Sequence, residues 1–137
     1  MPFLLALHSY ADWGLLALRL ALAAIFWVHG RSKAGMWKMQ PSAQMPAKTI
    51  SIMKLLSICE PLGALAMVVG FLTQPAALGF SLIMLGAIHS KKNVWKTPFK
   101  ADDKTGWEFD LLILAASLFL LLAGAGAFSL DRLLFRL

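Results

Sequence analysis

Cysteine is almost absent from this 137-residue chain, which has only Cys59. A single cysteine forms no disulfide within the chain and has no second thiol for dithiol redox chemistry. Charged residues make up only 15% of the composition, whereas 59% of the residues are hydrophobic and the mean hydropathy is +0.71. This balance is unlike that of soluble globular proteins and predicts a single integral membrane domain over residues 1–137.

The sequence also lacks the motifs of several common enzyme classes. It has no glycine-rich phosphate loop, no dinucleotide-binding fingerprint and no nucleophilic triad pattern. Its histidines are not spaced four residues apart and no cysteine cluster accompanies them, so we expect no metal or haem site. The first 12 residues contain no Lys or Arg, so they lack the basic start of a secretory signal.

The net charge of +6 comes from lysines and arginines that mostly flank the apolar runs. This arrangement orients membrane proteins, since cytoplasmic loops carry an excess of Lys and Arg, and nucleic acid is not an expected partner. Residues 30–49 and 91–106 hold nine of these cations, whereas the other side has only Arg132 and Arg136. Both loops are therefore expected in the cytoplasm and both termini outside, in a multi-pass protein of the bacterial cytoplasmic (inner) membrane.

Four apolar runs predict membrane-spanning helices, because about 20 apolar residues cross a hydrocarbon core about 30 Å thick. These runs cover residues 13–29, 50–72, 75–90 and 107–128. The turn Thr73-Gln74-Pro75 is short, so the second and third spans must be antiparallel neighbours. The predicted fold is an all-α bundle of four transmembrane helices.

Small residues recur in the second and third predicted spans, at four-residue or seven-residue spacing. They are Gly63, Ala66, Gly70, Gly79 and Gly86. Small side chains let helix backbones approach closely in membranes. We therefore expect these residues to lie between the two spans.

A carboxylate, Glu60, lies in the middle of the second predicted span beside Pro61, which is expected to kink the helix. A charge at the bilayer centre costs about 2.5–3.5 kcal/mol on insertion scales, so Glu60 should face a partner or a wet cavity. Counted along the helices, Arg19 of the first span lies at a similar depth and is expected to meet Glu60. The serines expected to complete this midplane belt are Ser57, Ser81 and Ser117. The pair is either a structural clasp or part of a site.

A second polar cluster is expected at the cytoplasmic mouth of the bundle. His29 ends the first span, His89 ends the third and Glu108 begins the fourth. A histidine beside a carboxylate is suited to proton exchange with a quinone head group or an acidic small substrate. The alternative is helix capping, because the helix dipole favours His at a C-terminus and Glu at an N-terminus.

Several tryptophans are placed where an aromatic belt at the membrane interface would be. They are Trp27, Trp37, Trp95 and Trp107. Of these, Trp107 is assigned as a surface on which a ring-shaped cofactor stacks. Cys59, next to Glu60, is interpreted as a packing residue, because a thiol in apolar surroundings is inert.

With these residues in view, the chain resembles the DoxX family of small four-helix membrane proteins along nearly its whole length. The matching segments are LRLALAAIFWVHGRSK at 18–33, Glu60-Pro61-Leu62-Gly63 with Gly70-Phe71-Leu72-Thr73, AALGFSLIMLGAIH at 76–89, Gly106-Trp107-Glu108-Phe109, and GAGAFSLDRLL at 124–134. The resemblance implies a membrane subunit linked to redox metabolism. Its motifs place the functional positions at Arg19, His29, Lys33, Glu60 and Glu108.

The leading hypothesis is a membrane subunit of a quinone-linked oxidoreductase. In it, His29 and Glu108 exchange protons near a quinone, and Arg19 and Glu60 tune the pocket. The same cofactor pocket is assigned to Arg19, His29, His89 and Trp107. One alternative is a non-catalytic accessory subunit of a larger respiratory or photosynthetic complex, and another is a small-solute permease. The expected partners are the lipid bilayer and other protein subunits, or further copies of the chain.

Overall fold

The computed structural model describes residue 4 and residues 6–135, and the regular secondary structure of these residues is entirely helical. The elements are η1 (Leu7–Tyr10), α2 (Ala11–Ser32), η2 (Lys33–Lys38), α3 (Ala47–Val69), α4 (Thr73–His89), η3 (Ser90–Val94), α5 (Trp107–Ala123) and α6 (Leu130–Phe135). The expected all-α class is confirmed. Arg136, counted among the cations above, lies outside the described residues.

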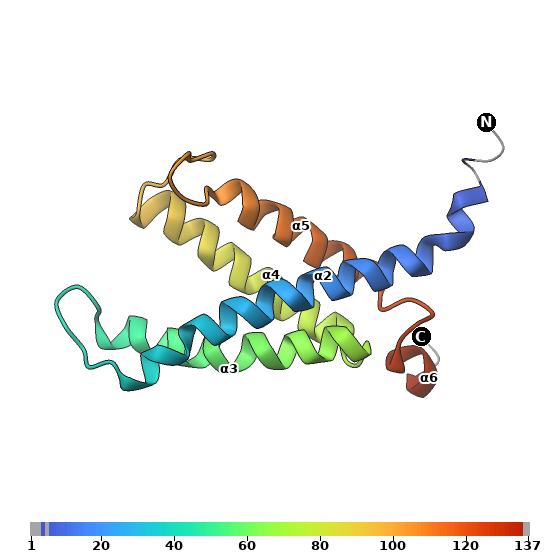
Figure 1. Cartoon of the computed structure of the whole chain (residues 1–137), viewed down its shortest axis with the longest axis horizontal. Helices are drawn as coiled ribbons and strands as arrows, with labels where there is room; N and C mark the ends of the chain where they lie inside the picture. The colour runs from blue at the N-terminus through green and yellow to red at the C-terminus, as the bar shows by residue number, and fades with distance from the viewer. Residues whose placement is uncertain (1–3, 5, 136–137) are drawn as a thin grey trace.

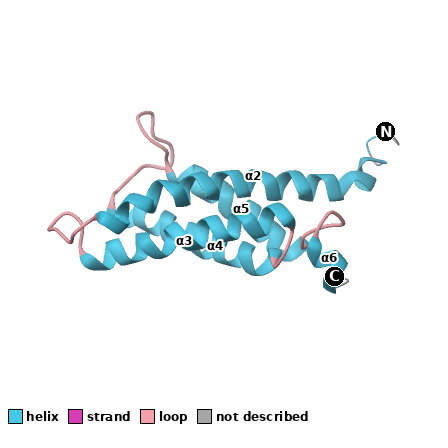
Figure 2. Cartoon of the chain, turned by 60° about the horizontal axis from the view of Figure 1, so that its bottom comes forward, coloured by secondary structure: helices cyan, strands magenta, loops and turns pink. Residues whose placement is uncertain are grey.

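The four long helices form two antiparallel hairpins, α2 with α3 and α4 with α5, and most contacts between helices lie within these hairpins. The hairpins meet where α3 turns into α4 and diverge toward the two long loops (Figure 1). Both loops lie away from the chain termini in the second view as well (Figure 2). We call the end with residues 33–46 and 90–106 the loop end, and the end with residues 70–73 and 124–135 the terminal end.

The turn between the hairpins depends on left-handed backbone conformations. Gly70 caps α3 with φ 66°, and the N–H of Phe71 returns to the carbonyl of Ala66 at 3.0 Å. Leu72 then adopts φ 53° and the next residue begins α4. A glycine that follows a helix in this conformation is a common way to end it, because it has no Cβ to clash. The helices α3 and α4 are therefore antiparallel neighbours, as the short connection between them predicts.

The fourth apolar run is helical over a shorter length than expected. The sequence predicts a helix to residue 128, but α5 ends at Ala123. The next residue, Gly124, has φ 79°, and Gly126 has the same value. These left-handed glycines turn the chain out of the helix axis, so that residues 124–135 fold back against the terminal end of the bundle.

Pro61 does not interrupt α3, which continues through it. Its ring packs on α2 at Gly30, where an added Cβ would lie 2.7 Å from Pro61 Cγ and 3.0 Å from Glu60 Cβ. Only glycine allows α2 to pass so close to α3 at this point. The two helices therefore approach closely beside the buried acid.

An aromatic stack joins the two hairpins. The rings of Phe26 on α2 and Phe80 on α4 are parallel within 7°, with centroids 3.5 Å apart, and both residues are buried. Gly63 of α3 makes room for this stack, because a Cβ there would lie 2.6 Å from Phe80 Cε1. By contrast, nothing lies within 4 Å of a Cβ added at Gly79 or Gly86. The expectation that these two glycines pack between α3 and α4 is therefore wrong.

Two helical segments among the described residues, Leu7–Lys38 and Ala47–Val69, are long and apolar enough to cross a membrane. Only 22% and 17% of their apolar windows are buried, whereas the core helix of a soluble protein is mostly buried. Large apolar side chains are also exposed on α4 and α5, for example Leu82 and Leu122 at 61% and 84%. An apolar outer face suits lipid as the surrounding solvent.

The close contact at Gly63 predicts a matched pair of outcomes. Gly63→Val is expected to lower the free energy of unfolding by about 1–3 kcal/mol, because the new side chain displaces Phe80 from its stack. Gly79→Ala is expected to raise it by about 0.5–1 kcal/mol, since it enters open space in a helix. Thermal unfolding of both variants in detergent measures the difference. Equal stability of the two variants would contradict the packing described for Gly63.

Candidate functional site

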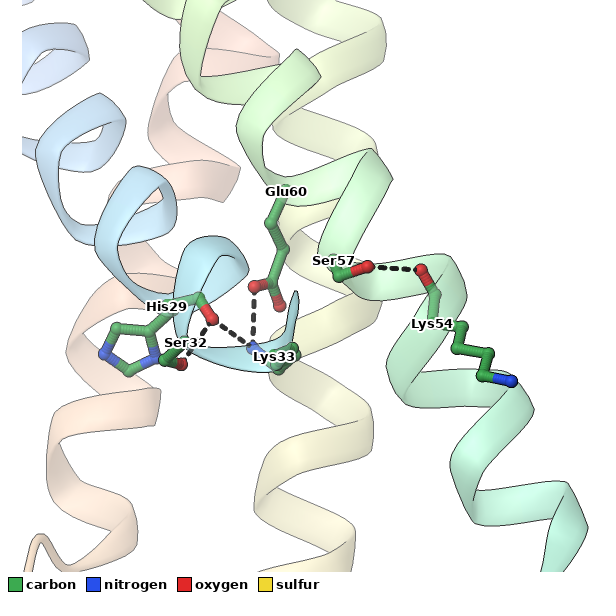
Figure 3. Close-up of polar contacts among 6 residues, drawn as sticks. All are labelled: His29, Ser32, Lys33, Lys54, Ser57 and Glu60. Atoms are coloured by element: carbon green, nitrogen blue, oxygen red, sulfur yellow. Dashed lines mark hydrogen bonds and ion pairs between the residues drawn. The ribbon is translucent and has the colours of Figure 1, made fainter. Parts of the chain in front are cut away.

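The most buried carboxylate of the loop-end half is Glu60, which forms an ion pair with Lys33. Glu60 is 1% exposed, and its Oε2 lies 2.6 Å from Lys33 Nζ. Lys33 is the first residue of η2, directly after α2 ends, and its ammonium also donates to the carbonyl of His29 at 3.1 Å (Figure 3). The ammonium therefore bridges the C-terminal end of α2 to the middle of α3, and it satisfies a helix carbonyl as well as the acid.

The segment η2 is held against α3 by a second set of polar contacts. Trp37 Nε1 donates to Ser57 Oγ at 2.9 Å, and Ser57 Oγ donates to the carbonyl of Lys54 at 2.7 Å. The ammonium of Lys54 lies 5.6 Å from the centroid of the Trp37 ring. These contacts fix the path of the chain after α2, so that Lys33 points back toward Glu60. Ser57 thus belongs to this group and not to a midplane belt.

His29 contributes its backbone to this group, while its ring is free. The carbonyl accepts hydrogen bonds from Lys33 and from Ser32, the latter at 2.7 Å. The imidazole is exposed, points away from Glu60 in Figure 3, and makes no hydrogen bond to another described residue. An exposed imidazole within one helical turn of a buried ion pair is placed to exchange protons with water.

Arg19 does not meet Glu60, contrary to the expectation from counting residues. Arg19 lies on α2, 14 residues before Lys33 at the start of η2, and this separation is about 21 Å of helix rise. It is completely buried at the terminal end, where Nη2 donates to the carbonyl of Phe128. Its Nε and Nη1 have no hydrogen-bond partner among the described residues. The two charged residues of the predicted midplane belt, Arg19 and Glu60, therefore lie toward opposite ends of the bundle.

Asp131, which the sequence does not single out, organises the terminal end. Its Oδ1 accepts from the N–H of Leu72 at 2.7 Å, and its Oδ2 accepts from the N–H of Thr73 at 2.9 Å. Its own N–H donates to the carbonyl of Gly70 at 2.8 Å. This side chain caps α4 from 58 residues away in the sequence, and it ties the C-terminal segment to the turn between the hairpins. In the sequence Asp131 lies within the matching segment 124–134 as one acid in an apolar tail, and nothing there indicates which groups it binds.

The second hairpin has its own ion pair at the loop end. Lys91 Nζ lies 2.7 Å from Asp110 Oδ2, and Asp110 is 6% exposed. The lysine lies in η3, directly after α4, and the acid lies in the first turn of α5. Each hairpin thus pairs a lysine that follows its first helix with a carboxylate on its second helix. The sequence shows both residues, but nothing in it indicates that they pair.

The other residues predicted for this region are not brought into one cluster. His89 Nδ1 lies 3.0 Å from Asn93 Nδ2, while Glu108 is exposed and donates its backbone N–H to the carbonyl of Phe99. Trp107 packs edge-on against Phe99, with ring centroids 4.5 Å apart. No hydrogen bond or ion pair among the described residues joins His29, His89 and Glu108.

The remaining polar residues of the expected belt lie on the second hairpin. Ser81 Oγ donates to the carbonyl of Ala77 at 2.8 Å, one turn back on the same helix. Ser117 is fully buried, and its hydroxyl has no partner among the described residues. Within residues 6–135, no three His, Cys, Asp or Glu side chains come together in a group that could hold a metal ion.

Comparison with known proteins gives two matches. The family model described as DoxX matches residues 14–95, which is more than half of the chain. The chain is also 31% identical over 127 residues to a protein of Bacillus subtilis (strain 168) named "Putative oxidoreductase CatD", and the match covers 90% of this chain and 88% of that protein. No solved structure matches the chain.

The Lys33–Glu60 ion pair predicts a coupled effect on stability. Lys33→Met is expected to lower the free energy of unfolding by about 3 kcal/mol, because it leaves a buried carboxylate without its counter-charge. The double variant Lys33→Met with Glu60→Gln should recover part of this loss, since a neutral amide needs no cation. Denaturation in detergent, followed by tryptophan fluorescence, measures both values.

The control for this cycle is Lys100→Met, which removes an exposed loop cation and should change stability by at most about 0.5 kcal/mol. A Lys33→Met variant as stable as this control would show that the ion pair is not required by the fold.

Proposed function

The chain belongs to the DoxX family, as its motifs predict, and from that premise we propose that it is an integral membrane subunit of a quinone-linked oxidoreductase. In this proposal α2, α3, α4 and α5 all cross the bacterial cytoplasmic membrane. The loop end, which carries most of the cations, faces the cytoplasm, and both termini lie outside. The relative named as an oxidoreductase supports the redox assignment.

The observation that carries the proposal is the Lys33–Glu60 ion pair. A buried carboxylate is expensive in an apolar helix, and ionisable groups within membrane helices mark functional sites by default. Glu60 is held at the level where α2 ends, so it lies within reach of the cytoplasmic surface through the side chain of Lys33, which is 18% exposed. The site thus combines a buried carboxylate with a partly exposed lysine that connects it to water.

The residues around Glu60 fit a quinone head group in part. Only Oε2 of Glu60 is hydrogen-bonded to another described residue, so Oε1 is free to bind a polar ligand atom. The exposed imidazole of His29 lies on the neighbouring helix. Arg19 does not fit such a pocket, because its guanidinium lies at the terminal end. The proposed site is therefore narrower than the sequence indicates and consists of His29, Lys33 and Glu60.

In this site a bound quinone supplies the capacity to accept two electrons and two protons. Lys33 holds the Glu60 carboxylate in place and lowers the cost of its charge. Glu60 Oε1 receives or delivers a proton inside the bundle, and the His29 ring exchanges protons with water at the loop end. The electron donor is proposed to be a separate subunit that binds the cytoplasmic loops.

Substitutions at two residues test this assignment. Glu60→Gln and His29→Ala are each expected to lower the rate of quinone reduction by about 10²-fold, because each removes a proton-transfer group. The assay uses the complex solubilised gently from native membranes, with its partners identified by mass spectrometry. Asp103→Asn, an exposed loop acid, serves as the control and should keep the full rate. Full activity in both site variants would refute the assignment.

A second candidate function is an accessory subunit that docks into a larger membrane complex. The observation that favours it is the open face of α4, where Gly79 and Gly86 are two turns apart and have no neighbour within 4 Å of an added Cβ. Small residues on a lipid-facing helix allow close approach of a partner helix.

This candidate predicts a loss of assembly without a loss of folding. Gly79→Leu and Gly86→Leu together should release the chain from its complex on native gels, because leucine blocks close helix approach. Ala115→Leu, an exposed position on α5, is the matched control. A complex that survives the double substitution would contradict docking through this face.

A further inference from the structure

An apolar groove runs along the outer face of the first hairpin, between α2 and α3. Its volume is about 260 Å³. Leu20, Ala24 and Trp27 line it from α2, and Ala64, Leu65 and Val68 line it from α3. The small alanine side chains leave the space that forms the groove, and the larger leucine and valine side chains form its walls. The two helices are in contact with each other, so the groove is formed within the hairpin itself.

A cation lies at the loop-end limit of this groove. Leu20, Ala24, Trp27 and Arg31 follow one another at spacings of four, three and four residues, which places them on one stripe of α2. The guanidinium carbon of Arg31 lies 6.0 Å from the centroid of the Trp27 ring. Arg31 is exposed and forms no ion pair with a described residue. The stripe therefore passes from apolar side chains to an indole and then to a free positive charge.

We propose that this groove binds an anionic phospholipid, with one acyl chain between α2 and α3 and its phosphate at Arg31. An apolar hollow suits an acyl chain, and a tryptophan is favoured at the level of the headgroups. A guanidinium binds phosphate through two parallel hydrogen bonds. Along α2 the groove comes first, then the indole and then the cation. A lipid with its acyl chain in the groove would therefore have its phosphate at the cation, with the indole at the membrane interface between them.

The charge of the loop end favours an anionic lipid over a neutral one. Eight cations at this end form no ion pair with a described residue: Arg31, Lys38, Lys48, Lys54, Lys92, Lys96, Lys100 and Lys104. Cations next to a membrane attract anionic headgroups. The inference rests on the membrane insertion proposed above, but it does not depend on the redox chemistry.

Lipid retention by the purified chain tests this site. The full chain in detergent is mixed with equal amounts of phosphatidylglycerol and phosphatidylcholine that carry the same acyl chains, and native mass spectrometry counts each bound lipid. Phosphatidylglycerol should be retained about fivefold more, the ratio expected for one cation near a headgroup. Arg31→Gln should bring the two lipids close to parity, whereas Lys100→Gln, which removes another loop cation, should keep the preference.

A second pair of variants tests the groove itself. Ala24→Leu fills the hollow from an exposed position and should reduce retention of both lipids, whereas Ala21→Leu, exposed on the same helix outside the groove, should not. Equal effects of Arg31→Gln and Lys100→Gln would overturn the proposal, as would a quinone or a second copy of the chain found in the groove. Because Arg31 and Ala24 lie outside the proposed redox site, quinone reduction by these variants separates this inference from that function.

Discussion

The structure depends on the need to neutralise buried carboxylates inside an apolar helix bundle, and the two long hairpins each meet this need with a lysine of their own. Lys33 reaches Glu60 in the first hairpin, and Lys91 reaches Asp110 in the second. In both cases the lysine lies just beyond the end of the first helix of its hairpin, in the short helical segment η2 or η3. The long side chain reaches inward while its backbone stays at the end of the bundle. Each hairpin thus pairs one buried carboxylate internally, whereas the buried Arg19 of α2 donates to the carbonyl of Phe128, outside the hairpins.

Apolar packing then joins the two hairpins, and hydrogen bonds from backbone N–H groups to a side-chain carboxylate hold the turn between them. The stack of Phe26 on Phe80 holds them at the centre, and Asp131 binds the turn between α3 and α4 at the terminal end. No comparable described contact joins the long loops at the other end, where the hairpins diverge (Figure 1). The loop end is therefore where a buried acid, an exposed imidazole and most of the cations lie near one another and near water. This placement is why both the proposed proton site and the proposed lipid site involve this end.

The candidate site shows where counting along a sequence fails. Arg19 and Glu60 would have similar depths only if all helices began at the same level. The helices do not begin at the same level. About 20 Å of α3 precedes Glu60, and this part extends beyond the end of α2 to pack against η2. The axial offset between the helices brings Lys33 beside Glu60 and leaves Arg19 at the other end. Such an offset depends on close packing at Gly30 and Pro61, which no periodicity in the sequence reveals.

The sequence by itself determined the all-helical class, the family, the positions of the long helices and the separation of cations from apolar runs. These follow from composition, run length and local motifs, which act over a few residues. The tertiary structure alone decided the partners of the buried charges, the end of α5 at Gly124 and the capping of α4 by Asp131. These depend on the rotation and offset of one helix against another. Those two quantities are set by side-chain packing between segments far apart in the chain, and a linear pattern does not contain them.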